Sequence, residues 1–158
     1  MLLAPEEVLE QLDAVLDAAA SVGVDDAETW SVQLQRRLNR LEAIVTAAVG
    51  DVDRSGSIGN ARNTAAWFAH RAGLPKHRAT RLVVNAKAMR SMPSVAAAFP
   101  AGEVNGDHVA VLASAHATNP EAFKKHEDDL VDVAKVDRFD LFERHVTYWR
   151  QITAPDVV

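Results

Sequence analysis

The sequence contains no cysteine, and its 158 residues include one tyrosine. Without cysteine the chain can form neither a disulfide nor a thiolate-ligated zinc site, which fits a reducing compartment. No apolar run approaches the ~18 residues of a membrane-spanning helix. The start "MLLAPEEVLEQLDAV" also lacks the basic region and long apolar stretch of a signal peptide. We therefore expect a cytoplasmic protein that does not associate with membranes.

Acidic residues are also missing from one long part of the chain. No Asp or Glu occurs from Arg54 to Gly102, and this window holds eight Lys and Arg residues. Residues 1–53 hold eleven acids and three bases, and residues 103–158 hold eleven acids and six bases. The net charge of −5 therefore hides a cationic segment. Local charge, rather than the average, decides which polyanion can approach a surface.

Twenty-eight alanines and few alternating β-branched residues favour helices over strands. We expect a single all-α domain over residues 1–158, with seven to eight helices around one core and a central helix-turn-helix-like pair. "GDVDRSGSIGN" reads as a loop and "SVAAAFPAG" as a short apolar turn. Apolar spacing and capping residues place the helices near 5–20, 27–50, 60–72, 75–91, 106–117, 119–134 and 137–153. Asn60 or Asn63 can cap the third of these, Gly73 is expected to close it in the left-handed conformation, and Asn105 is expected to cap the helix near 106–117.

The central pair is predicted from four spaced residues. A helix-turn-helix needs a small residue at the helix crossing, a glycine in the turn four positions later, and apolar residues six and nine beyond the glycine. Ala69, Gly73, Ala79 and Leu82 have this spacing. A step of about 100° per residue from Ala79 then turns other side chains of the second helix outward. From this helix and the end of the preceding one we take as DNA-binding candidates Arg71, Lys76, His77, Arg78, Thr80, Arg81, Asn85 and Lys87.

The chemistry of these side chains suits DNA, since arginine can bond guanine bidentately and asparagine adenine. Two alternatives stay open: a purely structural helix pair with a solvated basic face, and a protein-binding surface. Val84 and Ala88 are also expected to point outward, which suits packing against another helix. Trp67 is expected to anchor the core of the pair.

Residues for catalysis are not recognisable. None of the six histidines falls at the i, i+3 or i, i+4 spacing that places two metal ligands on one helical face. The chain also lacks a Gly-x-Ser-x-Gly elbow and a Ser-x-x-Lys pair. We expect no catalytic residues, no metal site, no cofactor and no enzyme activity.

The run "NTAAWFAHRAGLPKHRATRLVVNAKAMRSMPSVAAAFPAGEVNGDHVAVLASA" resembles the domain of unknown function 222 of the 13E12-repeat family. The shared order is an alanine-tryptophan helix, a Gly-Leu turn, an arginine-rich helix with a Leu-Pro-like step, and an "aGe(v/l)…H" helix. In many members this domain precedes a C-terminal HNH nuclease module. We expect that module to be absent from residues 1–158. The resemblance implies a DNA-binding domain that targets a nuclease or acts alone as a regulator; an oligomer is compatible with it.

The same helix order is similar, more distantly, to the DNA-binding region of ParB-type partition proteins. Those proteins have Gly-His-Ala-Arg where this chain has "GDHV", Gly106 to Val109. Asp107 is thus an insertion and the arginine is missing. The likeness therefore implies the order of helices and DNA binding, and not a role in partition.

Overall fold

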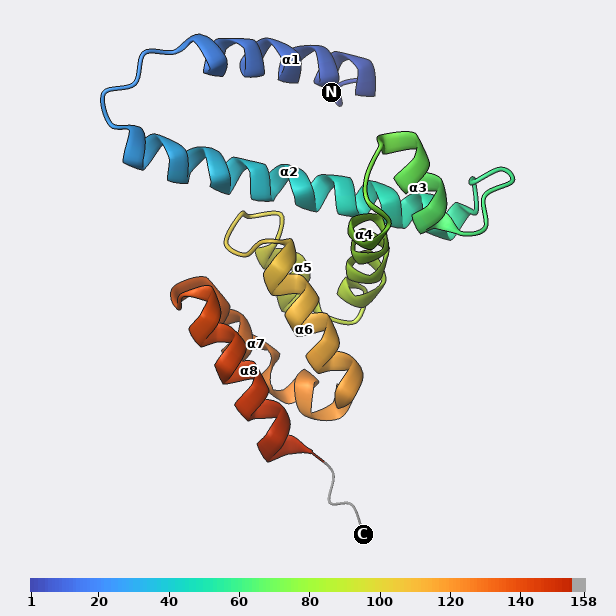
Figure 1. The fold of residues 1–158 in the computed structure, drawn as a ribbon, viewed down its shortest axis with the longest axis vertical. Helices are drawn as coiled ribbons and strands as arrows, with labels where there is room; N and C mark the ends of the chain where they lie inside the picture. The colour runs from blue at the N-terminus through green and yellow to red at the C-terminus, as the bar shows by residue number, and fades with distance from the viewer. Residues whose placement is uncertain (155–158) are drawn as a thin grey trace. The chain divides into compact units, whose positions relative to one another are not determined.

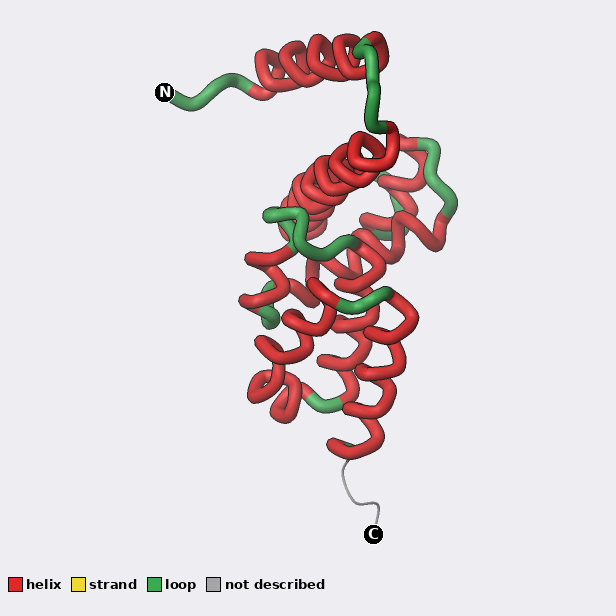
Figure 2. Tube along the Cα trace, turned by 90° about the vertical axis from the view of Figure 1, so that its left-hand side faces the viewer, coloured by secondary structure: helices red, strands yellow, loops and turns green. Residues whose placement is uncertain are grey.

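The structure, a computed structural model, describes residues 1–154 and contains eight α-helices and no strand within them (Figures 1 and 2). The predicted all-α fold is confirmed. By their mutual contacts, residues Met1–Leu34 form one compact unit and residues Gln35–Val158 form a second. The expectation of a single domain over residues 1–158 stays a prediction.

The first unit holds helix α1 (Pro5–Ser21) and the beginning of α2 (Ala27–Ser55). Pro5 is the first residue of α1, where a backbone N–H would have no partner within the helix, so proline loses no hydrogen bond. Two glutamates follow in the first turn, where negative charge interacts favourably with the helix dipole. Before α2, the Asp26 carboxylate accepts hydrogen bonds from the N–H and the hydroxyl of Thr29, at 3.0 and 2.6 Å. These bonds lower the pKa of Asp26. Helix α1 has no buried residue.

Helix α2 is longer than the sequence predicts, because it passes through Gly50 and ends at Ser55. The expected loop from residue 50 is therefore wrong over its first six residues. Glycine often ends a helix, but Gly50 is buried where α2 crosses another helix. A β-carbon on Gly50 would lie 3.0 Å from the β-carbon of Ala86. Gly50 thus serves close packing rather than helix termination.

Helices α3 (Thr64–Ala72) and α4 (Lys76–Met89) form the predicted central pair. Of the two candidate caps, Asn63 is the one used, and its side chain accepts from the N–H of Ala66 at 2.8 Å. Gly73 closes α3 in the left-handed conformation, at φ 69°, as expected. The turn leads directly to Pro75, which precedes α4.

The rest of the second unit consists of α5 (Pro93–Ala98), α6 (Gly106–Thr118), α7 (Pro120–Val136) and α8 (Phe139–Thr153). The apolar segment expected as a turn is thus partly helix α5. Its first turn is held by α7, where the buried Glu127 carboxylate accepts from the N–H of Val95 at 3.0 Å. Asn105 caps α6 as predicted. Helices α6, α7 and α8 pack on one another (Figure 1).

The core of the second unit has two parts. The larger is built by α5 to α8 around residues that include Phe99, Phe123 and Phe142, all fully buried. The smaller joins α2, α3 and α4 through Val49, Ala65, Ala79 and Val83. On α4, Leu82, Val83 and Ala86 are buried as the helical spacing predicts.

The crossing of α2 and α4 predicts a specific stability effect. Replacing Gly50 with Val adds side-chain volume against Ala86, and such overpacking typically costs about 1–3 kcal/mol. We expect urea denaturation to show that Gly50→Val lowers the free energy of unfolding by about this amount. Ala47→Val, at an exposed position of the same helix, is the matched control and should lose much less. Equal losses for the two variants would contradict the close crossing.

Candidate functional site

Three cations at the junction of α3 and α4 have no acidic partner in the part of the chain that the structure describes. Arg71 lies in the last turn of α3, and Lys76 and Arg78 lie in the first turn of α4; all three are exposed. Within residues 1–154, none of the salt bridges involves them. The positive charge at this junction is therefore not neutralised by an ion pair with any residue of 1–154.

Two further candidates lie beside these cations, since His77 and Thr80 are also exposed on the first turns of α4. The helix begins after Pro75, and no side chain caps its N-terminus. Uncapped amide groups and the helix dipole both favour an anion at such an end. We call Arg71, Lys76, His77, Arg78 and Thr80 the basic surface.

Arg81 is engaged with acidic residues of other helices. Its guanidinium forms an ion pair with Asp107 at 2.7 Å, and its second nitrogen lies 3.9 Å from the Glu42 carboxylate. These groups cross directly over Gly106, where a β-carbon would collide with them. Asp107 is 26 residues from Arg81, so local spacing could not reveal the pair. Only the insertion of Asp107, relative to the ParB-type pattern, hinted at a special role.

An open groove of about 560 Å³ adjoins this pair. Apolar side chains from α2, α3 and α4 line it, together with Arg78, Arg81 and Asp107. The Glu42 carboxylate also lines it, so both acidic partners of Arg81 border the groove.

The outward orientation expected for Asn85 is wrong. Its side chain is 1% exposed and donates from Nδ2 to the carbonyl oxygen of Gly106 at 3.2 Å, while its Oδ1 has no hydrogen-bond partner among residues 1–154. The expectation assumed one buried face on the helix. Because α6 packs on α4 opposite the smaller core, Asn85 is covered and cannot reach a base edge.

Lys87 is exposed but lies 3.6 Å from the Asp53 carboxylate near the end of α2. Asp53 also accepts a hydrogen bond from the Thr64 hydroxyl at 2.7 Å. That bond, and secondarily the charge of Lys87, lowers the pKa of Asp53. Lys87 therefore helps to join α2, α3 and α4, and contributes less positive charge to the surface than expected.

Two apolar residues differ from expectation. Trp67 is only partly buried and lies outside both parts of the core, because Ala65, Phe68 and Ala69 occupy the inward face of α3. Ala88 packs against the larger core instead of pointing outward. Val84 is exposed as expected.

His108 has a structural role in α6. The backbone N–H of His108 donates to Oδ1 of Asn105, and the ring Nδ1 of His108 accepts from the backbone N–H of Asn105, both at 3.0 Å. This reciprocal capping box requires an unprotonated Nδ1. The ring also contacts Phe139 and Phe142 edge-on. Burial lowers the pKa of His108, and the charge of Asp107 opposes this only in part.

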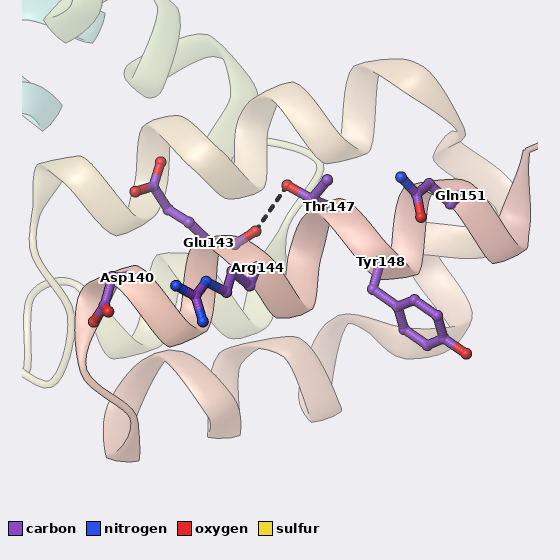
Figure 3. Close-up of a pocket in the computed structure, with 6 residues that line it drawn as sticks. All are labelled: Asp140, Glu143, Arg144, Thr147, Tyr148 and Gln151. Atoms are coloured by element: carbon purple, nitrogen blue, oxygen red, sulfur yellow. Dashed lines mark hydrogen bonds between the residues drawn. The ribbon is translucent and has the colours of Figure 1, made fainter.

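A depression on α8 is a less promising site. All six residues that line it come from α8 and are exposed (Figure 3). Its one drawn hydrogen bond, from the Thr147 hydroxyl to the Glu143 carbonyl oxygen, lies within the helix. It is the solvent-facing side of an amphipathic helix. Over residues 1–154 no three His, Asp or Glu side chains converge to hold a metal ion.

Fold and site together define an all-α domain with a basic surface at a central pair of helices. The chain belongs to the family described as Domain of unknown function (DUF222), whose model matches residues 27–146. No curated protein and no solved structure matches the chain. None of the helices in residues 1–154 combines the length and the apolar character needed to cross a membrane.

The capping box predicts a pH dependence of stability. Because the pKa of folded His108 is lowered, the unfolded state binds the proton more readily, and the stability falls as the pH drops below the ordinary histidine pKa of about 6.5. The loss levels off below the folded pKa. Glutamine at this position keeps the box without titrating. We expect thermal melts of His108→Gln to lose less stability than the parent between about pH 7.5 and 5.5; the same loss in both proteins would refute this role of His108.

Proposed function

We propose that this chain is a non-catalytic, DNA-binding helical domain that contacts DNA through the basic surface. The observation that carries the proposal is the group of exposed cations Arg71, Lys76 and Arg78, which have no acidic partner within residues 1–154. Unpaired Lys and Arg side chains on one surface attract phosphates and release their counterions.

The helix pair supports this use of the surface. Gly73 turns the chain between α3 and α4, as in a helix-turn-helix, where the first turns of the second helix approach the base edges. In this arrangement His77 and Thr80 lie nearest the bases, and the three cations hold the backbone. Phosphate contacts then fix the position, and the two smaller polar residues adjust the sequence preference.

The proposed biological role follows the family likeness. In the cytoplasm, such a domain would position a nuclease module, of the HNH type that accompanies this domain in the 13E12-repeat family, or act alone as a regulator. The chemistry of strand cleavage would then belong to the partner module.

A second candidate is a protein-interaction module, which the exposed apolar side chains of α1 favour. Leu9, Val15 and Leu16 are more than half exposed, and α1 buries no residue. Clustered apolar residues on a surface helix are typical of a protein contact. Binding of DNA above the level of an acidic control protein would favour the first candidate, and its absence the second.

The salt dependence of binding tests the DNA proposal. Each neutralised phosphate lowers log affinity by about 0.9 per unit of log salt, so three contacts predict a slope of about −2.7. Lys76→Ala combined with Arg78→Ala should weaken binding to all duplexes and reduce the slope by about 1.8. Fluorescence anisotropy on a labelled duplex measures both quantities.

The matched control removes the same charge elsewhere, in Lys124→Ala combined with Lys125→Ala on the exposed side of α7. It should leave the slope close to that of the parent. Equal reductions in the two double variants would show that net charge, rather than the basic surface, drives binding.

We also predict that residues 1–158 do not cleave DNA. Hydrolysis of a phosphodiester usually needs a metal that activates water and stabilises the transition state. The expected result is no nicking of supercoiled plasmid with Mg²⁺, Mn²⁺ or Zn²⁺. Nicking that persists through purification and disappears in His108→Gln or His145→Ala would contradict a non-catalytic role.

A further inference from the structure

A second open cavity, of about 580 Å³, lies beside the basic surface. One wall is the outer face of α3, and the other is the loop that follows α2. Its lining residues are Ile58, Gly59, Ala61, Ala66, Trp67, His70 and Arg71. Arg71 thus belongs both to this cavity and to the basic surface.

Trp67 gives the cavity an aromatic wall. Its ring is only partly buried, and its neighbour Phe68 occupies the inward side of α3. The two rings are 6.1 Å apart and tilted by 32°, so Phe68 does not stack on the indole face. A partly exposed tryptophan is typical of a contact surface, because its large ring gains from being covered.

The polar groups of the cavity are cationic or neutral. Trp67, His70 and Arg71 share a face of α3, since residues three and four positions apart are neighbours on a helix. Arg71 has no ion pair with any residue of 1–154, and no acid lines the cavity. A flat aromatic wall beside an unpaired guanidinium suits a ligand that combines a planar ring with an anion.

We propose that this cavity binds one nucleotide, with its base on Trp67 and its phosphate on Arg71. The helical rise of 1.5 Å per residue separates these two positions by about 6 Å along α3, a span that one sugar bridges. Bases inside a duplex are stacked on each other and cannot reach Trp67. The cavity therefore selects an unpaired nucleotide, as at a single-stranded tail, while Lys76 and Arg78 hold the adjoining duplex.

This inference rests on the proposed function, and the experiment separates the two. Anisotropy is measured with a blunt duplex and with the same duplex carrying a short unpaired tail. The parent should bind the tailed duplex at least about five-fold more tightly, the lower range for one base stacked on an aromatic side chain. Trp67→Leu should lose this preference and keep its affinity for the blunt duplex, and Trp67→Phe should retain part of it.

Controls exclude a general loss of structure. Trp30→Leu makes the same replacement outside the cavity and should keep the tail preference. Ala61→Glu places a negative charge in the loop wall without altering a helix, and should remove the preference, whereas the neutral Ala61→Gln should keep most of it. A free mononucleotide is then added as a competitor. If it weakens binding of the tailed duplex and not of the blunt duplex, the cavity accepts any nucleotide. If it weakens neither, the cavity accepts only an unpaired nucleotide that is part of a strand.

Equal binding of blunt and tailed duplexes by the parent would overturn the inference and leave the proposed function intact. A tail preference that survives both Trp67→Leu and Ala61→Glu would do the same, because the unpaired nucleotide would then bind elsewhere. Binding of neither duplex would overturn the proposed function and the inference together.

Discussion

The close packing of α4 on two sides is the constraint on which the second unit depends. Ala79 and Val83 join it to α2 and α3 in the smaller core, and Met89 packs on the larger core near α5 and α6. Small residues make these approaches possible, above all Gly50 against Ala86. A helix held in this way has few exposed positions left. Most of them lie in its first turns, around the buried Ala79.

This packing also divides the charge along α4. Acids from α2 and α6 reach Arg81, and Asp53 reaches Lys87, so the later turns are largely neutralised. The first turn keeps its charge because neither Lys76 nor Arg78 forms an ion pair with a residue of the described part of the chain, 1–154. Opposite charges that are paired within a protein no longer attract a polyanion strongly. The cationic segment of the sequence therefore becomes a smaller basic surface than its composition indicates.

Local patterns predicted the parts of the fold that local forces decide. The Asn105 cap, the left-handed Gly73 and most helix positions follow from spacing and backbone preference, and the structure confirms them. The end of α2 and the short helix α5 are the exceptions. Contacts between distant segments could not be predicted in this way. From the sequence alone, we assumed that each helix has a single buried face. This assumption predicted that Asn85 points outward, although α6 covers it. It also predicted that Trp67 points inward, although Phe68 occupies that side of α3. Five of the eight candidate residues stay together on the basic surface, and Arg81, Asn85 and Lys87 leave it for contacts with other helices.

Hydrogen exchange on the full chain, with and without duplex DNA, tests the central claim most directly. Bound DNA restricts opening of the backbone that it covers and slows the exchange of those amides. The account predicts slower exchange at the end of α3 and the first turns of α4, residues 70–81, and unchanged exchange in α7 and α8. Slower exchange confined to α8, or no change at residues 70–81 under conditions where DNA is bound, would contradict it.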